Sequence, residues 1–216
     1  MNELANLRAY YYEFIAFTLF FTTDKSKFQR WQKQLSYLSK EPITKEDGAA
    51  FENLEKMSFE EFMQEQNELF FDFSFANVPL SASFYLEGRD EGEAKLKVIN
   101  ILRKTKFRRD EGSCKDSEDF IGFIFMFMAK LLNLNEQELA QELFKTIINE
   151  FEGEFCYLLK THKRARYFQS VANIFDSFMQ LERSVYGVSK QEMKHIAAES
   201  LAKKPYISKI EIFDID

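Results

Sequence analysis

The run FIGFIFMFMAKLL, residues 120–132, decides the fold class of this chain of 216 residues. A helix built from this run is apolar on nearly every side, which is typical of a helix at the centre of a bundle. The chain contains only 7 glycines and 3 prolines, the residues that end helices and mark turns in strand-rich folds. The sequence therefore predicts an all-α, single-domain helical bundle of roughly ten helices.

Amphipathic patterns on both sides of the central run predict its neighbours. In five segments apolar residues recur at intervals of three and four, which is the helical period. These segments are residues 4–15, 28–38, 59–70, 139–151 and 168–182. Leu4 and Leu7 belong to the predicted apolar face of the first helix. The 25 phenylalanines are expected to fill much of the core, or to line a groove, since each ring carries a large apolar area.

Capping signals predict where two helices begin. Ser58 with Glu61, and Asn135 with Glu138, fit the capping box, in which the first and fourth residues bond each other's backbone N–H groups. Both pairs precede apolar residues at helical spacing.

Two segments depart from the helical pattern. Asp72–Gly92 contains a proline and two glycines and is predicted to be an ordered connection of about 20 residues, a length that is often functional. Residues 190–203 predict a more polar helix. The organisation expected is one domain over residues 1–204 and an extended tail over residues 205–216, which could add to a partner or pack on the surface.

Charge and hydropathy limit the cellular locations and the classes of partner that the sequence predicts. The net charge of −6 argues against nucleic acid as a partner. The apolar stretch Tyr10–Phe21 is about 12 residues long, short of the roughly 20 needed to span a bilayer. It has no basic segment before it and no cleavage site after it, so neither membrane insertion nor a signal peptide is expected. The cytoplasm is the predicted location, and Cys114 and Cys156 are expected to be reduced there.

Known catalytic motifs are missing from the sequence. It contains no nucleophile elbow and no glycine-rich phosphate loop. Glu192 and His195 form a single Glu-x-x-His motif, whereas a di-iron bundle needs two of them. We therefore expect no enzyme activity, no cofactor and no metal site. A helical-bundle enzyme or ligand-binding protein is the rival class, and a tightly bound metal in the purified protein would indicate it.

The middle of the chain resembles a known family. Leu69-Phe70-Phe71 is followed by the segment Pro79–Glu87, PLSASFYLE, then by Glu118–Phe123, EDFIGF, and by the aromatic helix that begins at Tyr167. Their order and spacing resemble the TorD/DmsD/NarJ-like redox-enzyme maturation chaperones over residues 4–183. The chain departs from the family pattern at two places, where Phe120 replaces a histidine and Pro79-Leu80 replaces a proline- and tryptophan-containing pair.

The resemblance implies a cytosolic chaperone without enzyme activity. Such a protein binds the twin-arginine signal peptide, or the apo form, of a molybdenum-cofactor oxidoreductase and assists cofactor insertion before export. The alternative within the family is a NarJ-like assembly factor for an oxidoreductase subunit that is not exported. The chaperone is expected to be a monomer or a homodimer.

The resemblance also implies which residues bind the client. An apolar groove with carboxylates would suit a peptide that contains arginine. The candidate residues are Leu69, Phe70, Pro79, Ser83, Tyr85, Glu87, Glu118, Asp119 and Phe120. The connection before Glu87 and the start of the Phe120 helix are expected to face each other across this groove. The alternatives are that the apolar residues belong to the core, and that Asp119 is a carboxylate at a helix N-terminus. If Asp119 binds the client, Asp119→Asn should weaken binding and leave thermal stability almost unchanged.

Overall fold

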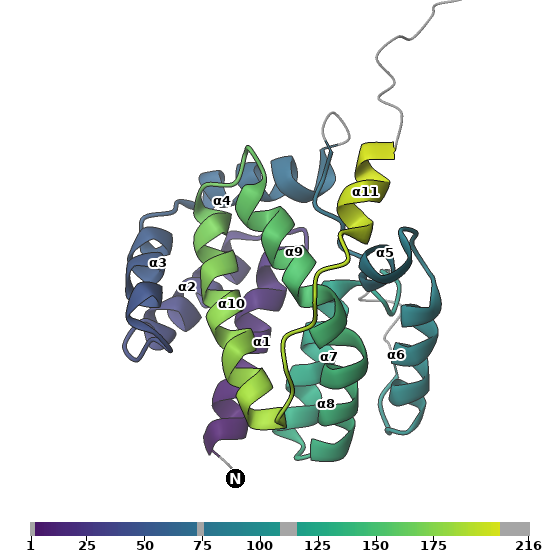
Figure 1. Cartoon of the computed structure of the whole chain (residues 1–216). Coiled ribbons are helices and arrows are strands. Elements are labelled where there is room, and N and C mark those ends of the chain that lie inside the picture. Colours follow the sequence, from purple (N-terminus) through teal and green to yellow (C-terminus); the bar gives the residue numbers. More distant parts are fainter. Residues whose placement is uncertain (1–2, 73–75, 109–115, 204–216) are drawn as a thin grey trace, which may run out of the picture.

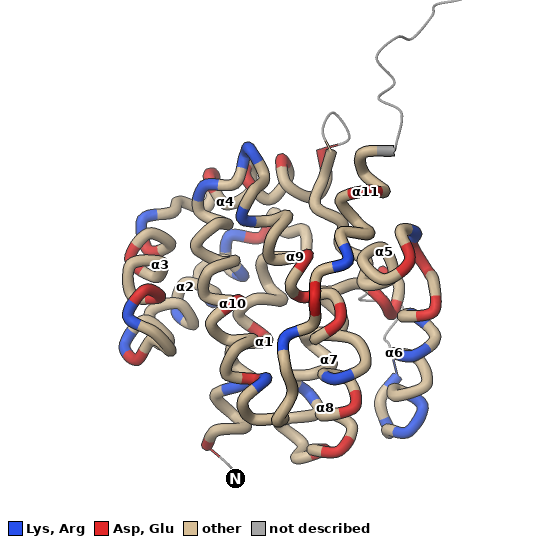
Figure 2. Tube along the Cα trace, in the orientation of Figure 1, with Lys and Arg blue, Asp and Glu red and all other residues tan. Residues whose placement is uncertain are grey.

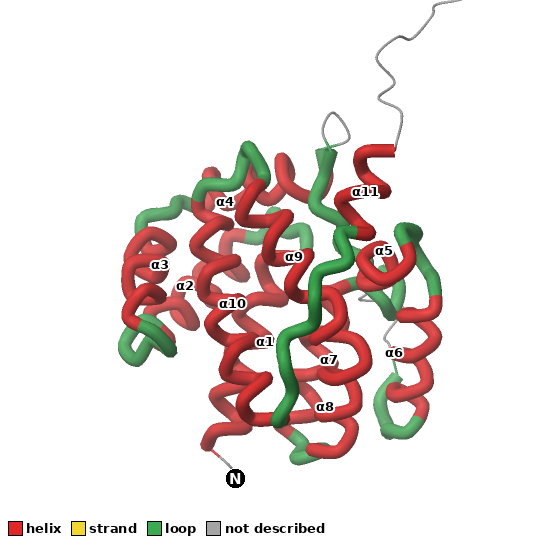
Figure 3. Tube along the Cα trace, viewed as in Figure 1, coloured by secondary structure: helices red, strands yellow, loops and turns green. Residues whose placement is uncertain are grey.

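The computed structural model describes residues 3–72, 76–108 and 116–203, and over these residues the protein is an all-α bundle (Figures 1 and 3). The described residues form eleven α-helices and two π-helical segments, and the one β feature among them is an isolated bridge. The α-helices are α1 (Glu3–Leu19), α2 (Lys25–Leu38), α3 (Lys45–Glu55), α4 (Phe59–Gln66), α5 (Ala82–Glu87), α6 (Glu93–Arg103), α7 (Ile121–Asn133), α8 (Gln137–Leu143), α9 (Asn149–Thr161), α10 (Tyr167–Tyr186) and α11 (Ile196–Lys203). The π-helical segment η1 (Asn67–Phe71) continues α4, and η2 (Phe144–Ile148) joins α8 to α9. The predicted fold class is confirmed.

Capping accounts for some helix starts and corrects one prediction. Ser58 Oγ accepts a bond from the Glu61 amide, and the Glu61 carboxylate accepts one from the Ser58 amide, so this capping box is confirmed. The second predicted box is wrong. Asn135 has a positive φ of 59°, and α8 follows Glu136 without a side-chain cap. The left-handed backbone at Asn135 closes the turn after α7, so this residue does not begin α8.

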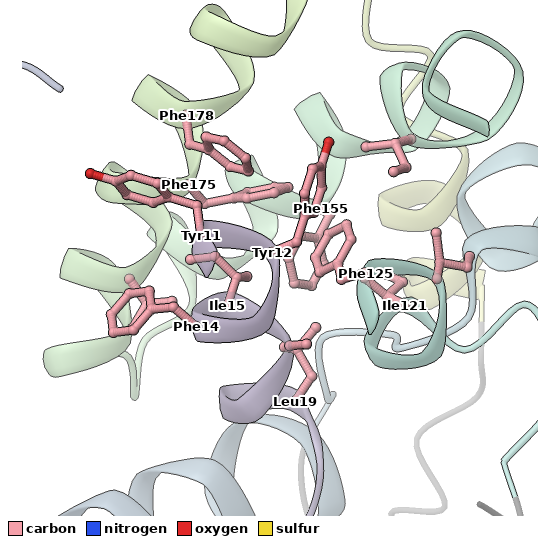
Figure 4. Packing of buried hydrophobic residues seen from close by; sticks show 14 of the residues in the cluster. Tyr11, Tyr12, Phe14, Ile15, Leu19, Ile121, Phe125, Phe155, Phe175 and Phe178 are labelled. Atoms are coloured by element: carbon pink, nitrogen blue, oxygen red, sulfur yellow. The ribbon is translucent and has the colours of Figure 1, made fainter. Parts of the chain in front are cut away.

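The core lies where α1 packs against α7, and α9 against α10 (Figure 1). Aromatic side chains fill it, as Figure 4 shows for the rings of Tyr12, Phe125, Phe175 and Phe178. Tyr12 meets Phe178 edge-on with ring centroids 4.8 Å apart, and Phe125 lies 5.3 Å from Phe175. The buried hydrophobic side chains form one continuous cluster from α1 to α11. The central position predicted for the apolar run 120–132 follows from this packing.

The buried face of α1 agrees with the predicted one at Tyr11, Phe14 and Ile15 and differs from it near the N-terminus. Leu4 and Leu7 are 44% and 38% exposed, whereas Arg8 is 3% exposed. The Arg8 guanidinium forms a two-bond ion pair with the Glu182 carboxylate of α10, which also accepts a bond from Tyr12 Oη at 2.8 Å. The burial of Arg8 is tolerated because its charge is paired and hydrogen-bonded.

Two predicted segments have different bounds in the structure. The connection Asp72–Gly92 contains the helix α5, and the predicted helix over 190–203 begins only at Ile196. The predicted tail, residues 205–216, lies outside the described residues. Within the part of the chain that the structure describes, no helix combines the length and the apolar character that a bilayer-spanning helix requires.

Candidate functional site

The two segments that carry the sequence motifs meet directly. Ser81 and Phe120 form an antiparallel bridge. The amide of Ala82 donates to the carbonyl of Asp119 at 2.8 Å, and the amide of Ile121 donates to the carbonyl of Leu80 at 2.8 Å. The segments were predicted to face each other across a groove, and this is wrong because backbone hydrogen bonds close the space between them.

Asp119 stabilises the contact between these two segments. Its side chain is 1% exposed. Its Oδ2 atom accepts hydrogen bonds from Ser81 Oγ at 2.8 Å, Ser83 Oγ at 2.5 Å and the backbone N of Glu91 at 3.2 Å. Burial by itself would raise the pKa of Asp119, but the hydrogen bonds, with that from Ser83 the strongest, hold the pKa below its ordinary value. The ionised carboxylate therefore ties both ends of α5 to the start of α7.

The apolar candidate residues belong to the core. Leu69, Phe70, Tyr85 and Phe120 are each at most 9% exposed. Phe70 lies edge-on to the Phe168 ring, and Tyr85 lies 6.0 Å from the Phe151 ring. These contacts favour the interpretation of these residues as core, and their part in client binding stays a prediction.

The polar candidates have different surroundings. Tyr85 Oη donates to the carbonyl of Pro79 at 2.8 Å, so Pro79, which is half-buried, helps to place the start of α5. Glu118 is also half-buried. Ser83 is buried and bonded to Asp119. Glu87 reaches the surface at the end of α5.

Glu87 is fixed at the end of α5 by its neighbours. Its carboxylate accepts a bond from the backbone N of Glu93 at the start of α6 and forms an ion pair with Arg89 at 2.9 Å. A Cβ atom at Gly92 would come 2.3 Å from this carboxylate, so a larger residue there would displace the Glu87 side chain from its present position. Gly88 ends α5 with a φ of +72°, a conformation that glycine adopts without strain.

An open cleft of about 640 Å³ begins beside Glu87 and lies between α5, α6, η2 and α9. It is lined by Leu86, Glu87, Glu93, Lys97, Asn100, Ile101, Glu142, Lys145, Thr146, Glu150 and Lys194. Four of these side chains are carboxylates and three are ammonium groups, next to apolar surface from Leu86 and Ile101. Figure 2 shows how the acidic and basic positions of α5 and α6 gather on this side of the molecule.

The sequence did not point to most of this cleft. Glu87 is the one candidate residue that lines it, and Leu86 belongs to the same motif. Glu142 and Glu150 lie on amphipathic helices, where acidic residues usually only face solvent. The π-helical segment η2 contributes Lys145 and Thr146 to the lining. Such π-bulges are often found at functional sites, but no simple sequence pattern predicts them.

Two features considered for chemistry are unsuited to it. Glu192 and His195 lie in an irregular segment before α11, so they do not form the helical pair that a bundle metal site requires. Cys156 is buried and donates to the carbonyl of Ala172. Burial raises the pKa of the Cys156 thiol to about 12, which keeps it in the unreactive protonated form. Cys114 lies outside the described residues.

Comparison with known proteins gives the family. Residues 29–156, more than half of the chain, match the family described as nitrate reductase delta subunit. The structure is similar to the crystal structure of a protein from Archaeoglobus fulgidus that is proposed to be a redox enzyme maturation protein. The TM-score is 0.59 and the identity 15%, over 80% of this chain and 93% of that chain. Comparison with curated proteins gives no significant match.

The family match defines the class of the protein as a maturation chaperone of redox enzymes, and the fold is of the same kind as that of the Archaeoglobus fulgidus protein. The chain belongs to the nitrate reductase delta subunit family, whose members are the NarJ/TorD-type chaperones. The resemblance drawn from the sequence motifs is thereby confirmed.

Proposed function

We propose that the protein is a cytoplasmic chaperone that binds the twin-arginine signal peptide, or the apo form, of a molybdenum-cofactor oxidoreductase and assists cofactor insertion before export. The cleft between α5, α6, η2 and α9 is the observation that carries this proposal. Its carboxylates can pair with guanidinium groups, and the half-buried Leu86 offers apolar contact for the residues that follow the arginines.

Within this proposal Asp119 positions the binding surface and does not contact the client. Its hydrogen bonds to Ser81, Ser83 and Glu91 fix α5 and the turn after it. They thereby fix Glu87 at the mouth of the cleft. Glu142 and Glu150 face Glu87 from the other side. A peptide that lies in the cleft meets carboxylates from both walls.

The test is a titration with synthetic peptides, followed by fluorescence anisotropy. One peptide carries two adjacent arginines followed by an apolar stretch, and the control peptide has glutamines in place of the arginines. Glu150→Gln keeps the size of the side chain and removes its charge, so it should weaken binding of the arginine peptide about tenfold, since a charge-assisted bond contributes about 1.5–3 kcal/mol. Glu52→Gln, at an exposed position of α3, is the matched control and should bind like the wild type. Equal binding of both peptides would refute the proposal.

A second client class is favoured by the description of the family as nitrate reductase delta subunit. In this alternative the client is an oxidoreductase subunit that is not exported, and the cleft binds a segment of its folded or partly folded chain. Affinity capture from the native cytosol separates the two, because the captured subunit either carries a twin-arginine signal or lacks one. Whether the chaperone is a monomer or a homodimer stays a prediction, and sedimentation analysis tests it.

A further inference from the structure

The chain itself covers one end of the cleft. After α10, residues 188–203, here called the arm, run along α9 and end in α11, which packs on α5 (Figures 1 and 3). The side chain of Asn149 on α9 donates to the carbonyl of Ser189 at 3.1 Å. Further along, Lys194 forms an ion pair with Glu150 at 3.7 Å. Because Lys194 and Glu150 both line the cleft, the arm forms part of its wall.

The helical part of the arm is seated in a shaped site. Ala197 is fully buried, and the backbone N of Ala198 donates to the Glu154 carboxylate of α9 at 2.9 Å. A Cβ atom at Gly88 would lie 2.4 Å from Ser200 Oγ. Because Gly88 has no side chain, α11 can pack closely against the end of α5. The site therefore combines a carboxylate with a close-packed apolar surface.

The arm places two basic residues before a short amphipathic helix. Lys190 and Lys194 come first, paired with Asp176 at 3.4 Å and with Glu150. The amphipathic helix IAAESLAK, α11, comes next; it buries Ala197 and also contains Glu199 and Ser200. Signals for export place basic residues before an apolar segment in the same order. Figure 2 shows the basic positions on the connection between α10 and α11.

We propose that the arm is an intramolecular substitute for the client: it occupies the extension of the cleft along α5 and α9, and a client segment with basic residues followed by an apolar helix displaces it. This inference rests on the proposed function, because it names the site and the regulation of the same binding event.

The space under the arm supports this assignment. A small cavity of about 10 Å³ lies there, room for a single water-sized group, and Leu86, Glu150 and Lys194 border both this cavity and the main cleft. Asn149 also lines the cavity, and its side chain is 2% exposed. In the described structure its Oδ1 atom has no hydrogen-bond partner. Removal of the arm would join the two spaces and offer this buried acceptor, with Glu150 and Glu154, to an entering donor.

The contacts of the arm are also weak enough for it to detach from the cleft. Residues 189–195 are exposed, and the side chains of Lys190 and Lys194 are 48% and 68% exposed. Ion pairs with this exposure contribute little to stability. Segments with few buried apolar contacts open at a lower free energy than the core of a domain. The seat of α11 is therefore the main restraint on the arm.

A disulfide that locks the arm gives the most direct test. A Cβ atom at Gly153 would lie 3.4 Å from Cγ of Met193. The Cβ atom of Met193 is one bond from this Cγ, so the two positions are close enough for a disulfide, in which the Cβ atoms lie about 3.5–4.5 Å apart. The full chain would carry Gly153→Cys and Met193→Cys, with Cys114→Ser to avoid a competing bond. The probe is the peptide with two arginines and an apolar stretch. The oxidised form should bind it at least tenfold more weakly than the same sample after reduction, and the reduced form should match the wild type.

Substitutions that release the arm should have the opposite effect. Ala197→Glu places a charge in the seat of α11, the main restraint on the arm, whereas Lys194→Glu removes only an exposed ion pair and should have a smaller effect. If the arm is docked for about nine-tenths of the time, its release tightens apparent binding roughly tenfold. Lys97→Glu changes the charge of the same cleft without touching the arm, so it measures the purely electrostatic gain. Ala197→Glu should tighten binding more than Lys97→Glu does, and the locked disulfide form still tests the inference if Ala197→Glu fails to fold.

Hydrogen exchange of the α11 amides reports whether the arm detaches when the peptide binds. Addition of the peptide should speed exchange of the α11 amides in the wild type. Slower exchange there would mean that the arm closes over the client, and this would overturn the inference. If the wild type binds and the locked form binds equally well, the inference fails and the proposed function stands. If no form binds any peptide, the proposed function fails and the inference fails with it.

Discussion

The substitution Asp119→Asn should destabilise the protein measurably. The hydrogen bonds from Ser81, Ser83 and the backbone of Glu91 end on Oδ2, so an asparagine oxygen in the same place could keep them with a neutral acceptor. A hydrogen bond to a charged group contributes about 1.5–3 kcal/mol, and a neutral one about 0.5–1.5 kcal/mol. The three bonds therefore lose about 3 kcal/mol in all, partly offset because no charge is buried. We expect a net loss of about 1–3 kcal/mol, the opposite of the unchanged stability expected from sequence.

The assay is thermal unfolding followed by circular dichroism. For a chain of this length a loss of about 1–3 kcal/mol lowers the melting temperature by about 3–10 °C. The pKa of Asp119 is lowered in the folded protein, so its contribution is complete above the unfolded value of about 3.9 and is lost as pH falls below it. The gap between wild type and Asp119→Asn should therefore be full at neutral pH and shrink below about pH 4. Equal melting temperatures at neutral pH, or a gap that does not change in acid, would refute the structural role of the charge.

Three further predictions test the core. Arg8→Ala leaves the Glu182 charge buried and unpaired and should cost about 3–5 kcal/mol, which urea unfolding would measure; a loss near zero would mean that the ion pair does not form. Phe125→Ala should also cost about 3–5 kcal/mol, whereas Phe21→Ala, at a side chain that is 59% exposed, should change stability by at most about 0.5 kcal/mol; similar losses for both would contradict the burial pattern. Cys156, with its raised pKa, should resist iodoacetamide in the native protein at about pH 8 and react after unfolding; rapid native labelling at this position, mapped by mass spectrometry, would argue against its burial.

Local patterns could be read directly because they depend on neighbours in the chain. The Ser58–Glu61 capping box involves residues three positions apart, and the structure contains it. The central position of the run 120–132 follows from its lack of a polar face, since such a helix has no side to turn to water. Scarce glycine and proline, with apolar residues at helical spacing, gave the all-α class in the same way. The Asn135 box failed although it is also local, because the turn after α7 requires a left-handed residue there.

Other features depend on residues that are far apart in sequence. The period of α1 defines its faces but not which of them is buried, and that choice depends on Glu182, 174 positions away, which pairs with Arg8. The sequence leaves three roles open for Asp119: a carboxylate at a helix N-terminus, a ligand of the client, or a buried acceptor that connects two segments. Its hydrogen bonds to Ser81 and Ser83 favour the third role.

The cleft is the feature that the sequence alone could least predict. Glu142 and Glu150 have the same pattern as any solvated acidic residue on an amphipathic helix, and nothing near them in the chain distinguishes them. They become a wall of one cleft only because α5, η2 and α9 pack around it. Composition and periodicity thus determined the class of secondary structure and the apolar content of the core, since those follow from short-range geometry and burial. The tertiary structure alone decided which charged surfaces face each other, because surface charges contribute too little to folding to leave a pattern in the sequence.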